Sequence, residues 1–309
     1  MDYSIKIGGE AGQGIQTVGD MLAHIFSRSG YWVFCHQDYE SRIRGGHNFY
    51  QIRIANKPVT CSRQEIDILV ALDKESIIYH EKELSENGHV LYDSSLIKEK
   101  FNRERYLDVP LIKLAIEHGG DKVMANSVAI GAVIGMLRMK PEIMVEFIQK
   151  TFAKKGKELV EANLRAARAG YALAERQCLT CSFILSELKP PKLLISGNEA
   201  IGLSALASGL KFFSAYPMTP STGIFNFVAE QALDFGIVVE QAEDEIAAIN
   251  MIIGASYAGV RSMTVTSGGG FALMVEGLSL AGMTETPIVV VLAQRPGPAT
   301  GFPTRTEAA

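Results

Sequence analysis

Three polar segments in the second half of the chain hold the residue types that bind a nitrogen heterocycle and a small acid. Hydroxyls stand in Tyr216-Pro-Met-Thr-Pro-Ser-Thr222, carboxylates in Glu243-Asp-Glu245, and a guanidinium in Pro303-Thr-Arg-Thr306. Each segment follows a predicted strand, and open α/β sheets bind ligands outside the carboxyl ends of their strands. We therefore predict that the three segments meet at one crevice and bind such ligands there.

Four carboxylates cluster at the start of one predicted helix, and they belong to Glu240, Glu243, Asp244 and Glu245. An ordinary explanation exists, because anions are favoured near the N-terminal end of a helix. The run that follows, residues 246–254, is almost wholly apolar, which predicts a buried helix. A carboxylate at the start of such a helix would be partly withdrawn from water. This makes it a strong hydrogen-bond partner for a ring nitrogen.

The hydroxyl segment and the arginine segment each have an ordinary explanation too. Pro220 suits the first turn of a helix, because no hydrogen-bond donor is lost there, and Thr219 would then be the N-cap. Taken alone, Thr219 is better explained by helix capping than by substrate binding. Arg305, between two threonines, has the planar fork that fits the two oxygens of a carboxylate, but a lone arginine in a loop is weak evidence.

Two glycine-rich loops each follow a predicted strand. The first, Gly9-x-x-Gly12-Gln13-Gly14, could bring backbone amides to an anion at a helix start. Its spacing is not that of a dinucleotide-binding loop, and no acidic residue is well placed on the second strand. The ordinary explanation is a tight turn that packs a helix against a strand. The second loop, Ser267-Gly-Gly-Gly270, could admit a ligand close to its backbone.

A basic loop that contains glycines runs from Arg42 through Arg44 to His47. Its two guanidinium groups could hold a phosphate or the carboxylates of a partner protein. The ordinary alternative is a solvated loop. We favour an interface to another subunit over direct ligand binding.

The cysteine pair Cys178-x-x-Cys181 has the spacing of a redox or zinc pair. A zinc site needs four ligands, and no second pair is clustered nearby. Cys35 and Cys61 are isolated in the sequence and are more easily explained as small buried hydrophobes. We therefore interpret the pair as a chance occurrence in a linker, and we predict no metal site and no iron–sulfur cluster in this chain.

Strand and helix patterns alternate in both halves of the chain, which is typical of parallel sheets covered on both faces. In the first half we predict strands over residues 3–7, 32–35, 49–54, 66–71 and 89–92, and helices after the first glycine loop and over 125–136, 142–152 and 157–176. In the second half we predict strands over 193–196, 212–215, 237–240, 263–266 and 288–293, and helices over 199–210, 219–232, 243–257 and 271–283. Right-handed crossovers then make the second half a doubly wound sheet.

Length and composition indicate a soluble protein of two domains. The chain has 309 residues, of which 47% are hydrophobic and 21% charged. A net charge of −4 argues against nucleic acid as a partner, and no apolar run reaches the roughly 18 residues of a membrane span. Four cysteines and no visible export signal indicate a reducing, cytoplasmic location.

We predict domains at residues 1–177 and 192–309, with a linker at 178–191. The linker contains Lys189-Pro-Pro191, and two adjacent prolines cannot continue a helix. A doubly wound domain rarely ends directly after a strand and a loop. We therefore expect the chain to be the N-terminal part of a longer polypeptide.

Together these motifs resemble the 2-oxoacid:ferredoxin oxidoreductases, which use thiamine diphosphate. The second half is similar to that family's pyrimidine-binding domain through segments 216–222, 243–248, 254–255, 266–270 and 297–307. The first half is similar to its gamma domain through segments 8–14 and 42–46. The resemblance implies an α/β fold with a Rossmann-like gamma domain followed by a doubly wound pyrimidine-binding domain. Gamma before alpha is the order in the family's fused alpha subunits, of the 2-oxoglutarate type.

The resemblance also assigns roles to particular residues. Glu245 would be the catalytic glutamate that contacts N1′ of the cofactor's aminopyrimidine and favours its imino tautomer. Thr219 would bind the substrate through its hydroxyl, and Arg305 would pair with the substrate carboxylate. The cofactor would also contact Tyr216, Pro217, Ser267, Gly268 and Gly269. Gly12, Gln13, Gly14, Arg42 and Arg44 are candidates for loop or interface contacts.

The same resemblance implies a partner and a reaction. A separate beta subunit would hold the cofactor's diphosphate and Mg²⁺ and carry an iron–sulfur cluster, so this chain should be inactive alone. The complex would convert a 2-oxoacid, 2-oxoglutarate being expected, and coenzyme A to acyl-CoA and CO₂, and would reduce ferredoxin. The loop Ser267-Gly-Gly-Gly270 departs from the family's commoner Ser-Gly-Pro-Gly, which should loosen it slightly.

Two alternatives stay open at this point. One is a nicotinamide-dependent dehydrogenase with an N-terminal Rossmann domain. The other is a non-catalytic assembly module, in which both domains only dock a partner.

Overall fold

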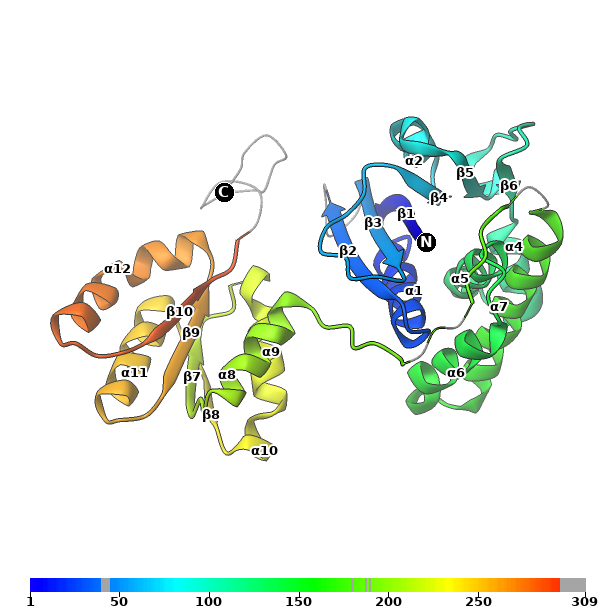
Figure 1. Cartoon of the computed structure of the whole chain (residues 1–309). Coiled ribbons are helices and arrows are strands. Elements are labelled where there is room, and N and C mark those ends of the chain that lie inside the picture. The colour runs from blue at the N-terminus through cyan, green and yellow to red at the C-terminus, as the bar shows by residue number, and fades with distance from the viewer. Residues whose placement is uncertain (40–44, 179–180, 187, 189, 295–309) are drawn as a thin grey trace. The chain divides into compact units, whose positions relative to one another are not determined.

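The structure is a computed structural model of the chain. It describes residues 1–39, 45–178, 181–186, 188 and 190–294. It divides into two compact units, Met1–Leu194 and Ile195–Ala309 (Figure 1). Both units are built from strands and helices in the α/β manner, which confirms the predicted fold class. No helix in the described ranges is both long and apolar enough to cross a membrane.

The first unit contains a six-stranded sheet in the order β2-β3-β1-β4-β5-β6. Its strands are β1 (Asp2–Ala11), β2 (Trp32–Tyr39), β3 (Gly45–Ala55), β4 (Ile66–Ala71), β5 (Leu84–Tyr92) and β6 (Tyr106–Asp108). Strands β1, β4, β5 and β6 run parallel, whereas β3 is antiparallel to both of its neighbours. The prediction of wholly parallel pairing was therefore wrong for β3. Strand β2 ends at Tyr39 and β3 begins at Gly45, which is too short a connection for a parallel crossover, so the two pair antiparallel.

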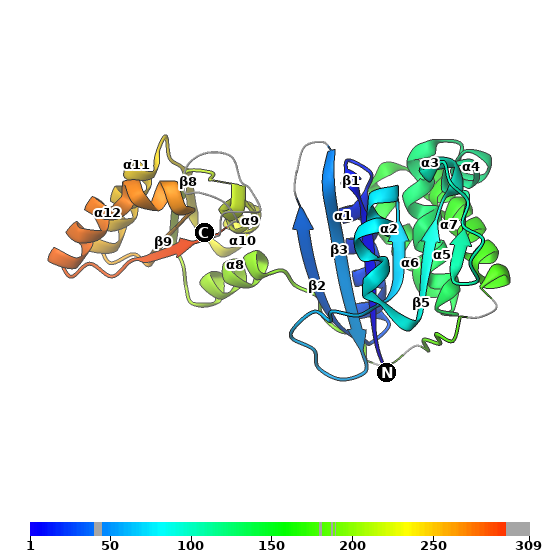
Figure 2. The same cartoon turned by 90° about the horizontal axis from the view of Figure 1, so that it is seen from above.

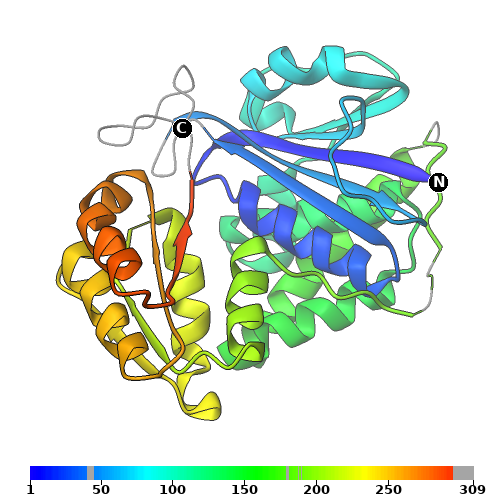
Figure 3. The ribbon, with the colours of Figure 1, turned by 60° about the vertical axis from the view of Figure 1, so that its left-hand side comes forward.

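Helices cover both faces of the first sheet. The longer ones are α1 (Ile15–Arg28), α2 (Lys74–His80), α5 (Ala125–Met136), α6 (Pro141–Phe152) and α7 (Lys157–Gln177). Short segments are α3 (Ser94–Ile97), α4 (Leu111–Leu114), a π-turn (Ala115–Gly119) and 3₁₀ turns at Glu81–Glu83, Lys122–Met124 and Ala153–Lys155. Side chains alternate across the strands, so Ile68 and Leu91 join the core under α1 and α5, whereas Leu69 and Val90 join the core under α2. Figures 2 and 3 show α2 on the opposite side of this sheet from α1.

We call residues 181–192 the strap, and several of its described residues pack against the first unit. Cys181, Phe183 and Leu185 are buried in the core of this unit, while the residues between them are exposed. Backbone bonds fix the strap from Leu185 N to Leu137 O at 3.0 Å, Leu188 N to Ser29 O at 2.7 Å and Lys192 N to Ser27 O at 2.8 Å. The Lys192 ammonium lies 4.7 Å from the ring centre of Trp32. Residues predicted as a linker therefore lie within the first unit.

The second unit contains four parallel strands in the order β10-β9-β7-β8. The strands are β7 (Phe212–Ala215), β8 (Val238–Gln241), β9 (Ser262–Thr266) and β10 (Val289–Leu292). The helices are α8 (Gly197–Ala207), α9 (Thr219–Glu230), α10 (Ala232–Phe235), α11 (Glu245–Tyr257) and α12 (Gly268–Met283). Helices α8 and α9 cover one face of the sheet, and α11 and α12 cover the other (Figure 1).

One predicted strand of the second unit, residues 193–196, does not form. The Leu193 side chain is 86% exposed, and the neighbouring Leu194 packs against the core of the first unit. The apolar run here reflects packing of the chain that follows the strap. A strand needs a hydrogen-bonding neighbour, and none pairs with these residues within the described part of the second sheet.

Candidate active site

A buried carboxylate stands at the first residue of α11, directly beyond the carboxyl end of β8. Only 5% of Glu245 is exposed, whereas Glu240, Glu243 and Asp244 are all exposed. Asp244 is the N-cap, and its carboxylate accepts a hydrogen bond of 2.7 Å from Ala247 N. The helix-start explanation thus accounts for Asp244. It does not account for Glu245, whose side chain turns inward instead of capping the helix.

The Glu245 carboxylate lies against the end of β9 and the first turn of α12. A Cβ placed on Gly270 would be 2.6 Å from Glu245 Oε1 and 2.2 Å from Thr266 Oγ1. A side chain at position 270 would therefore collide with the carboxylate, and glycine leaves the space that Glu245 fills. Among the described residues, no side chain or backbone amide donates a hydrogen bond to this carboxylate. A buried carboxylate that lacks an internal donor suits a ligand that supplies one.

The second glycine loop starts α12 beside this carboxylate. Ser267 is the N-cap and is buried, but its hydroxyl makes no capping bond. Gly268 and Gly269 begin the helix, and Gly268 is exposed. Amides of a first helical turn have no partner inside the helix, and the Ser267 side chain does not cap them. That this loop admits a ligand against its backbone stays a prediction.

The hydroxyl segment connects β7 to α9 at the same edge of the sheet. Tyr216 is 39% exposed, and Pro217 is half-buried. The helix begins at Thr219 with Met218 in the N-cap position, so the prediction of Thr219 as the N-cap was wrong. The helix starts at the predicted residue, and Pro220 occupies its first turn, where no hydrogen-bond donor is lost. The Thr219 side chain is exposed, and within the described residues its hydroxyl makes no hydrogen bond, which leaves it for a ligand.

The sheet order explains why these segments lie at one edge of the sheet. Strands β7 and β9 are neighbours, but the helices that follow them, α9 and α12, lie on opposite faces. Such a switch point opens a crevice outside the carboxyl ends of the two strands. The structure brings the side chains of Glu245 and Thr266 to the same side of Gly270, and it sets Thr219 at the same edge of the sheet. Arg305 lies outside the described residues, as do Arg42 and Arg44.

The residues of this crevice fit an aminopyrimidine. A ring nitrogen that carries hydrogen would find a buried acceptor in Glu245, and a flat ring would find glycine backbone instead of side chains at Gly268 and Gly269. Among the described residues at this edge, Glu245 is not part of a group of three potential metal ligands, and Mg²⁺ and Ca²⁺ need several oxygen ligands.

The first glycine loop is a tight turn whose amides are used within the chain. Glu10 N donates to Gln13 Oε1 at 2.8 Å, and Gln13 N donates to Glu10 O at 3.2 Å. Gly12 and Gly14 have φ values of 94° and 84°, which side chains rarely adopt, and a Cβ on Gly14 would lie 2.3 Å from Asn126 Nδ2. Packing and turn geometry therefore account for these glycines. The amides of Glu10 and Gln13 are not available for a dinucleotide phosphate.

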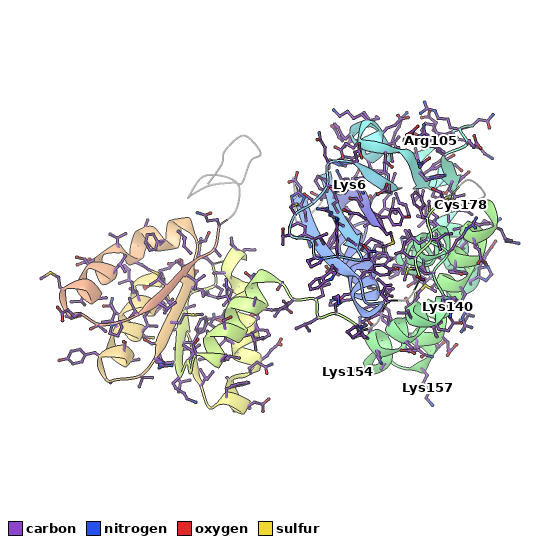
Figure 4. All side chains as sticks on the ribbon, viewed as in Figure 1. Lys6, Arg105, Lys140, Lys154, Lys157 and Cys178 are labelled. Atoms are coloured by element: carbon purple, nitrogen blue, oxygen red, sulfur yellow. A yellow bond between two sulfur atoms is a disulfide. The ribbon has the colours of Figure 1, made fainter. Side chains whose placement is uncertain are left out.

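A buried charged cluster in the first unit was not foreseen from the sequence. Lys6 pairs with Glu83 and lies 3.4 Å from His80 Nδ1, while His80 Nε2 lies 2.8 Å from His47 Nε2. Burial, and then the Lys6 charge, lower the pKa of His80. Burial alone would raise the pKa of Glu83, but hydrogen bonds from Lys6 and His80 hold it below its usual range. The cluster fastens α2 to β1, and Lys6 marks it in Figure 4.

The cysteine pair was also misjudged as a chance occurrence in a linker. Cys178 and Cys181 form a disulfide in the structure, and both are buried in the first unit, where α7 ends (Figure 4). His89 of β5 lies beside them, and burial lowers the pKa of this histidine. Sequence reasoning missed His89 because it stands far from the cysteines along the chain. A lone polar residue at the start of the apolar run 89–92 was the only signal.

Comparison with known proteins finds relatives along the whole chain. Residues 4–173 match a family model described as pyruvate ferredoxin/flavodoxin oxidoreductase. Residues 204–309 match one described as pyruvate flavodoxin/ferredoxin oxidoreductase, thiamine diphosphate-binding. The alpha subunit of 2-oxoacid:ferredoxin oxidoreductase from Saccharolobus solfataricus is 30% identical over 100% of this chain and 57% of that protein.

Two further relatives are more similar over part or all of the chain. The 2-oxoglutarate synthase subunit KorA of Archaeoglobus fulgidus is 51% identical over 36% of this chain and 32% of that protein. The solved 2-oxoglutarate:ferredoxin oxidoreductase of Magnetococcus marinus, with 2-oxoglutarate, coenzyme A and succinyl-CoA bound, has a TM-score of 0.87 and 35% identity. That match covers 98% of this chain and 54% of the solved chain, so this chain spans about half the length of such relatives.

Proposed function

Because the chain belongs to the 2-oxoacid:ferredoxin oxidoreductase alpha-subunit family, we propose that it forms half of a thiamine-diphosphate site that oxidatively decarboxylates a 2-oxoacid. The observation that carries this proposal is the buried Glu245 carboxylate, which accepts no hydrogen bond from the described residues and lies against Gly270 in the segment that matches a thiamine diphosphate-binding family model. We propose 2-oxoglutarate as the 2-oxoacid and coenzyme A as the acceptor, because the solved relative binds both.

Glu245 would hold the pyrimidine end of the cofactor. When bound, thiamine diphosphate supplies a nucleophilic carbon and an electron sink, which together allow CO₂ to leave a 2-oxoacid. The carboxylate would share a proton with a pyrimidine nitrogen, and a charge-assisted bond of this kind strengthens where water is excluded. Its burial among Thr266 and Gly270 fixes the acceptor in one orientation. The proton-holding atom is thus positioned before the cofactor arrives.

The other crevice residues would orient the ligands. The exposed Thr219 hydroxyl would donate to a substrate oxygen, and Tyr216 and Pro217 would line the same side. Ser267, Gly268 and Gly269 would offer backbone rather than side chains to the ring. Arg305 keeps its predicted role as the partner of the substrate carboxylate, as a residue outside those described.

A partner subunit would supply what these residues do not. We propose that a beta subunit holds the diphosphate with Mg²⁺ and carries an iron–sulfur cluster that passes electrons to ferredoxin. A cytoplasmic location, suggested by the low cysteine content, is part of the same proposal. The exposed apolar side chains of α12, such as Leu273 and Leu278, support such a partner, because large exposed apolar patches mark interaction surfaces.

The test compares two neighbouring glutamates in the complex with its beta subunit. Glu245→Gln keeps the shape of the side chain but removes its charge, so turnover of 2-oxoglutarate with coenzyme A should fall by at least about a hundredfold. Glu243→Gln changes an exposed carboxylate two positions away and should leave turnover nearly unchanged. Succinyl-CoA formation and reduction of a viologen dye give the rates. Bound thiamine diphosphate, measured in the same samples, separates lost catalysis from lost cofactor.

Normal turnover in Glu245→Gln would sink the proposal, because the carboxylate would then be no more than a helix-start anion. An unchanged complex with unchanged activity would point to the assembly-module alternative. Nicotinamide reduction by the wild-type chain would support the dehydrogenase alternative, which the internally bonded amides of Glu10 and Gln13 do not favour.

A further inference from the structure

Cys178, Cys181 and His89 form a cluster of metal-binding side chains that the proposed function does not use. Their exposed fractions are 4%, 4% and 3%. One ligand atom from each, two Sγ atoms and a ring nitrogen, lie within 4.8 Å of one another. Within the described part of the chain, no other group of three such side chains meets at this range. Three soft or borderline ligands therefore converge in the core of the first unit.

The fold holds the three residues from different directions. His89 is on β5 opposite Ile68 of β4, on the sheet face that the core under α5 covers. Cys178 caps the C-terminal end of α7, where its N–H donates to Ala174 O at 2.9 Å. Cys181 begins the strap. A strand, a helix end and the strap thus meet at one point, and each is anchored independently of the cluster.

Neighbouring contacts fix the orientation of the histidine ring. The Phe183 ring packs edge-on against it, with ring centres 5.6 Å apart and planes at 79°. His89 Nδ1 lies 2.8 Å from the carbonyl oxygen of Asn87. Histidines that bind metals commonly use one ring nitrogen for a backbone carbonyl in this way, because the contact sets the ring's direction and tautomer. The ring is therefore held toward the sulfurs before any ion binds.

The spread of the ligand atoms fits zinc. Zn–S bonds of about 2.3 Å and Zn–N bonds of about 2.0 Å place the ligand atoms of a tetrahedral site roughly 3.5–3.8 Å apart. A cluster within 4.8 Å reaches that spacing with small side-chain movements. Two sulfurs and one imidazole disfavour Mg²⁺ and Ca²⁺, which prefer oxygen. A water molecule would complete the tetrahedral site as the fourth ligand.

We propose that His89, Cys178 and Cys181 bind a zinc ion, or another soft divalent cation, when the cysteines are reduced. The disulfide is then the oxidised, metal-free state of the same two sulfurs. To interconvert them, a dithiol supplies two electrons and two protons, the S–S bond breaks, and the dithiol becomes a disulfide. Zinc binding then releases the two thiol protons to solvent. A disulfide alone would need no histidine, and the ring held beside the sulfurs is what points to a metal.

Metal binding would fasten the strap. The ion would join β5 to the end of α7 and to the first residue of the strap, which otherwise depends on the backbone bonds near Leu185 and Leu188. The site is therefore structural, and it acts on the segment that leads out of the first unit.

The experiment uses the purified full chain, reduced with dithiothreitol, desalted without oxygen and titrated with Co²⁺. We expect a cobalt–thiolate charge-transfer band that excess Zn²⁺ removes, and close to one zinc per chain by elemental analysis. Cys178→Ser and Cys181→Ser should each weaken zinc binding by at least about a hundredfold, and His89→Asn by about tenfold or more. Cys35→Ser combined with Cys61→Ser changes the two free cysteines and should leave binding unchanged.

The oxidised wild-type chain is a control that needs no substitution, because its sulfurs are blocked by the disulfide. It should show no thiolate band and gain one on reduction. If the reduced wild-type chain shows no band and holds no more zinc than the oxidised chain, the proposal is overturned and the pair is a disulfide only. This outcome decides the matter even if a cysteine variant does not fold.

Discussion

The two units use helices of similar apolar composition in opposite ways. In the first unit, ten of the twelve residues of α5 are buried. In the second, only four of the sixteen residues of α12 and six of the thirteen residues of α11 are buried. The apolar run 246–254 predicted a buried helix, yet Ile246 is 52% exposed and Met251 is 40% exposed. That prediction was therefore right for one face of α11 and wrong for the other.

The difference teaches that apolar composition predicts a need for burial but not where the partner is. Helix α5 finds its partner inside the unit, because it packs backbone to backbone on α7. A Cβ on Gly131 would lie 1.9 Å from Ala167 O, and one on Gly170 would lie 2.1 Å from Val128 O. In α11, a Cβ on Gly254 would meet nothing within 4 Å. The second unit thus keeps apolar surface, which suits association with another subunit.

The largest effect should come from adding one methyl group between α5 and α7. Gly131→Ala should destabilise the first unit by about 3 kcal/mol, because the backbone of α7 must move away. Gly254→Ala is the matched change in α11 and should instead stabilise its helix by up to about 1 kcal/mol. Urea unfolding followed by circular dichroism gives the values, and peptide-level hydrogen exchange shows which unit opens. Equal costs at both positions would remove the contrast.

Substitutions of large side chains by alanine should show the same difference between α5 and α12, with smaller changes in the free energy of unfolding. Val133→Ala in α5 removes a fully buried side chain and should cost about 2 kcal/mol. Leu278→Ala in α12 removes one that is 40% exposed and should change the free energy of unfolding by less than about 0.5 kcal/mol. We expect the loss at Leu278 to appear in binding to the proposed beta subunit, measured by titration calorimetry. Weak effects in both assays would mean that the exposed face has no partner.

Acid should act chiefly on the first unit, with the smallest effect of the three. Burial and the Lys6 charge lower the pKa of His80, so the unfolded chain takes up a proton near pH 6.5 while the folded chain does so at lower pH. The unfolded state then binds more protons, and the free energy of unfolding falls as the pH drops below about 6.5. The lowered pKa of Glu83 continues the loss at more acidic pH. In His80→Gln, denaturation between pH 5 and 7 should lack the upper part of this decline; an identical curve would contradict the assignment.

Much of the fold could be predicted because the apolar periodicity of a strand or helix is visible within its own stretch of sequence. The strands at 66–71 and 212–215 match their predicted bounds, as apolar runs bounded by turns. The antiparallel pairing of β3 and the extended strap were not predicted. An apolar pattern of period two indicates an extended segment, but it does not show which strand the segment pairs with or whether it joins a sheet at all. The prediction of a strand at residues 193–196 was wrong for the same reason.

The candidate site was predictable where a single segment carries the information. The apolar run 246–254 pointed to a partly buried carboxylate at the start of α11, and the family resemblance singled out Glu245 among the four candidates, whereas its position against Gly270 depends on how α12 packs. The His89 and cysteine cluster could not be found this way. His89 on β5 comes close to the cysteines only in the folded first unit, and the spacing of these residues along the sequence does not indicate it.

The contact between Trp32 and the strap means that tryptophan fluorescence should report on the position of the strap. Trp32 is the single tryptophan, and the Lys192 ammonium stands over its indole ring. A cation this close alters the electrostatic field at the indole, so its departure should shift the emission of the fluorophore. Lifting the end of the strap would therefore be visible in intrinsic fluorescence, in real time and without a dye. Reduction, zinc loading and subunit docking could each be followed by that colour change.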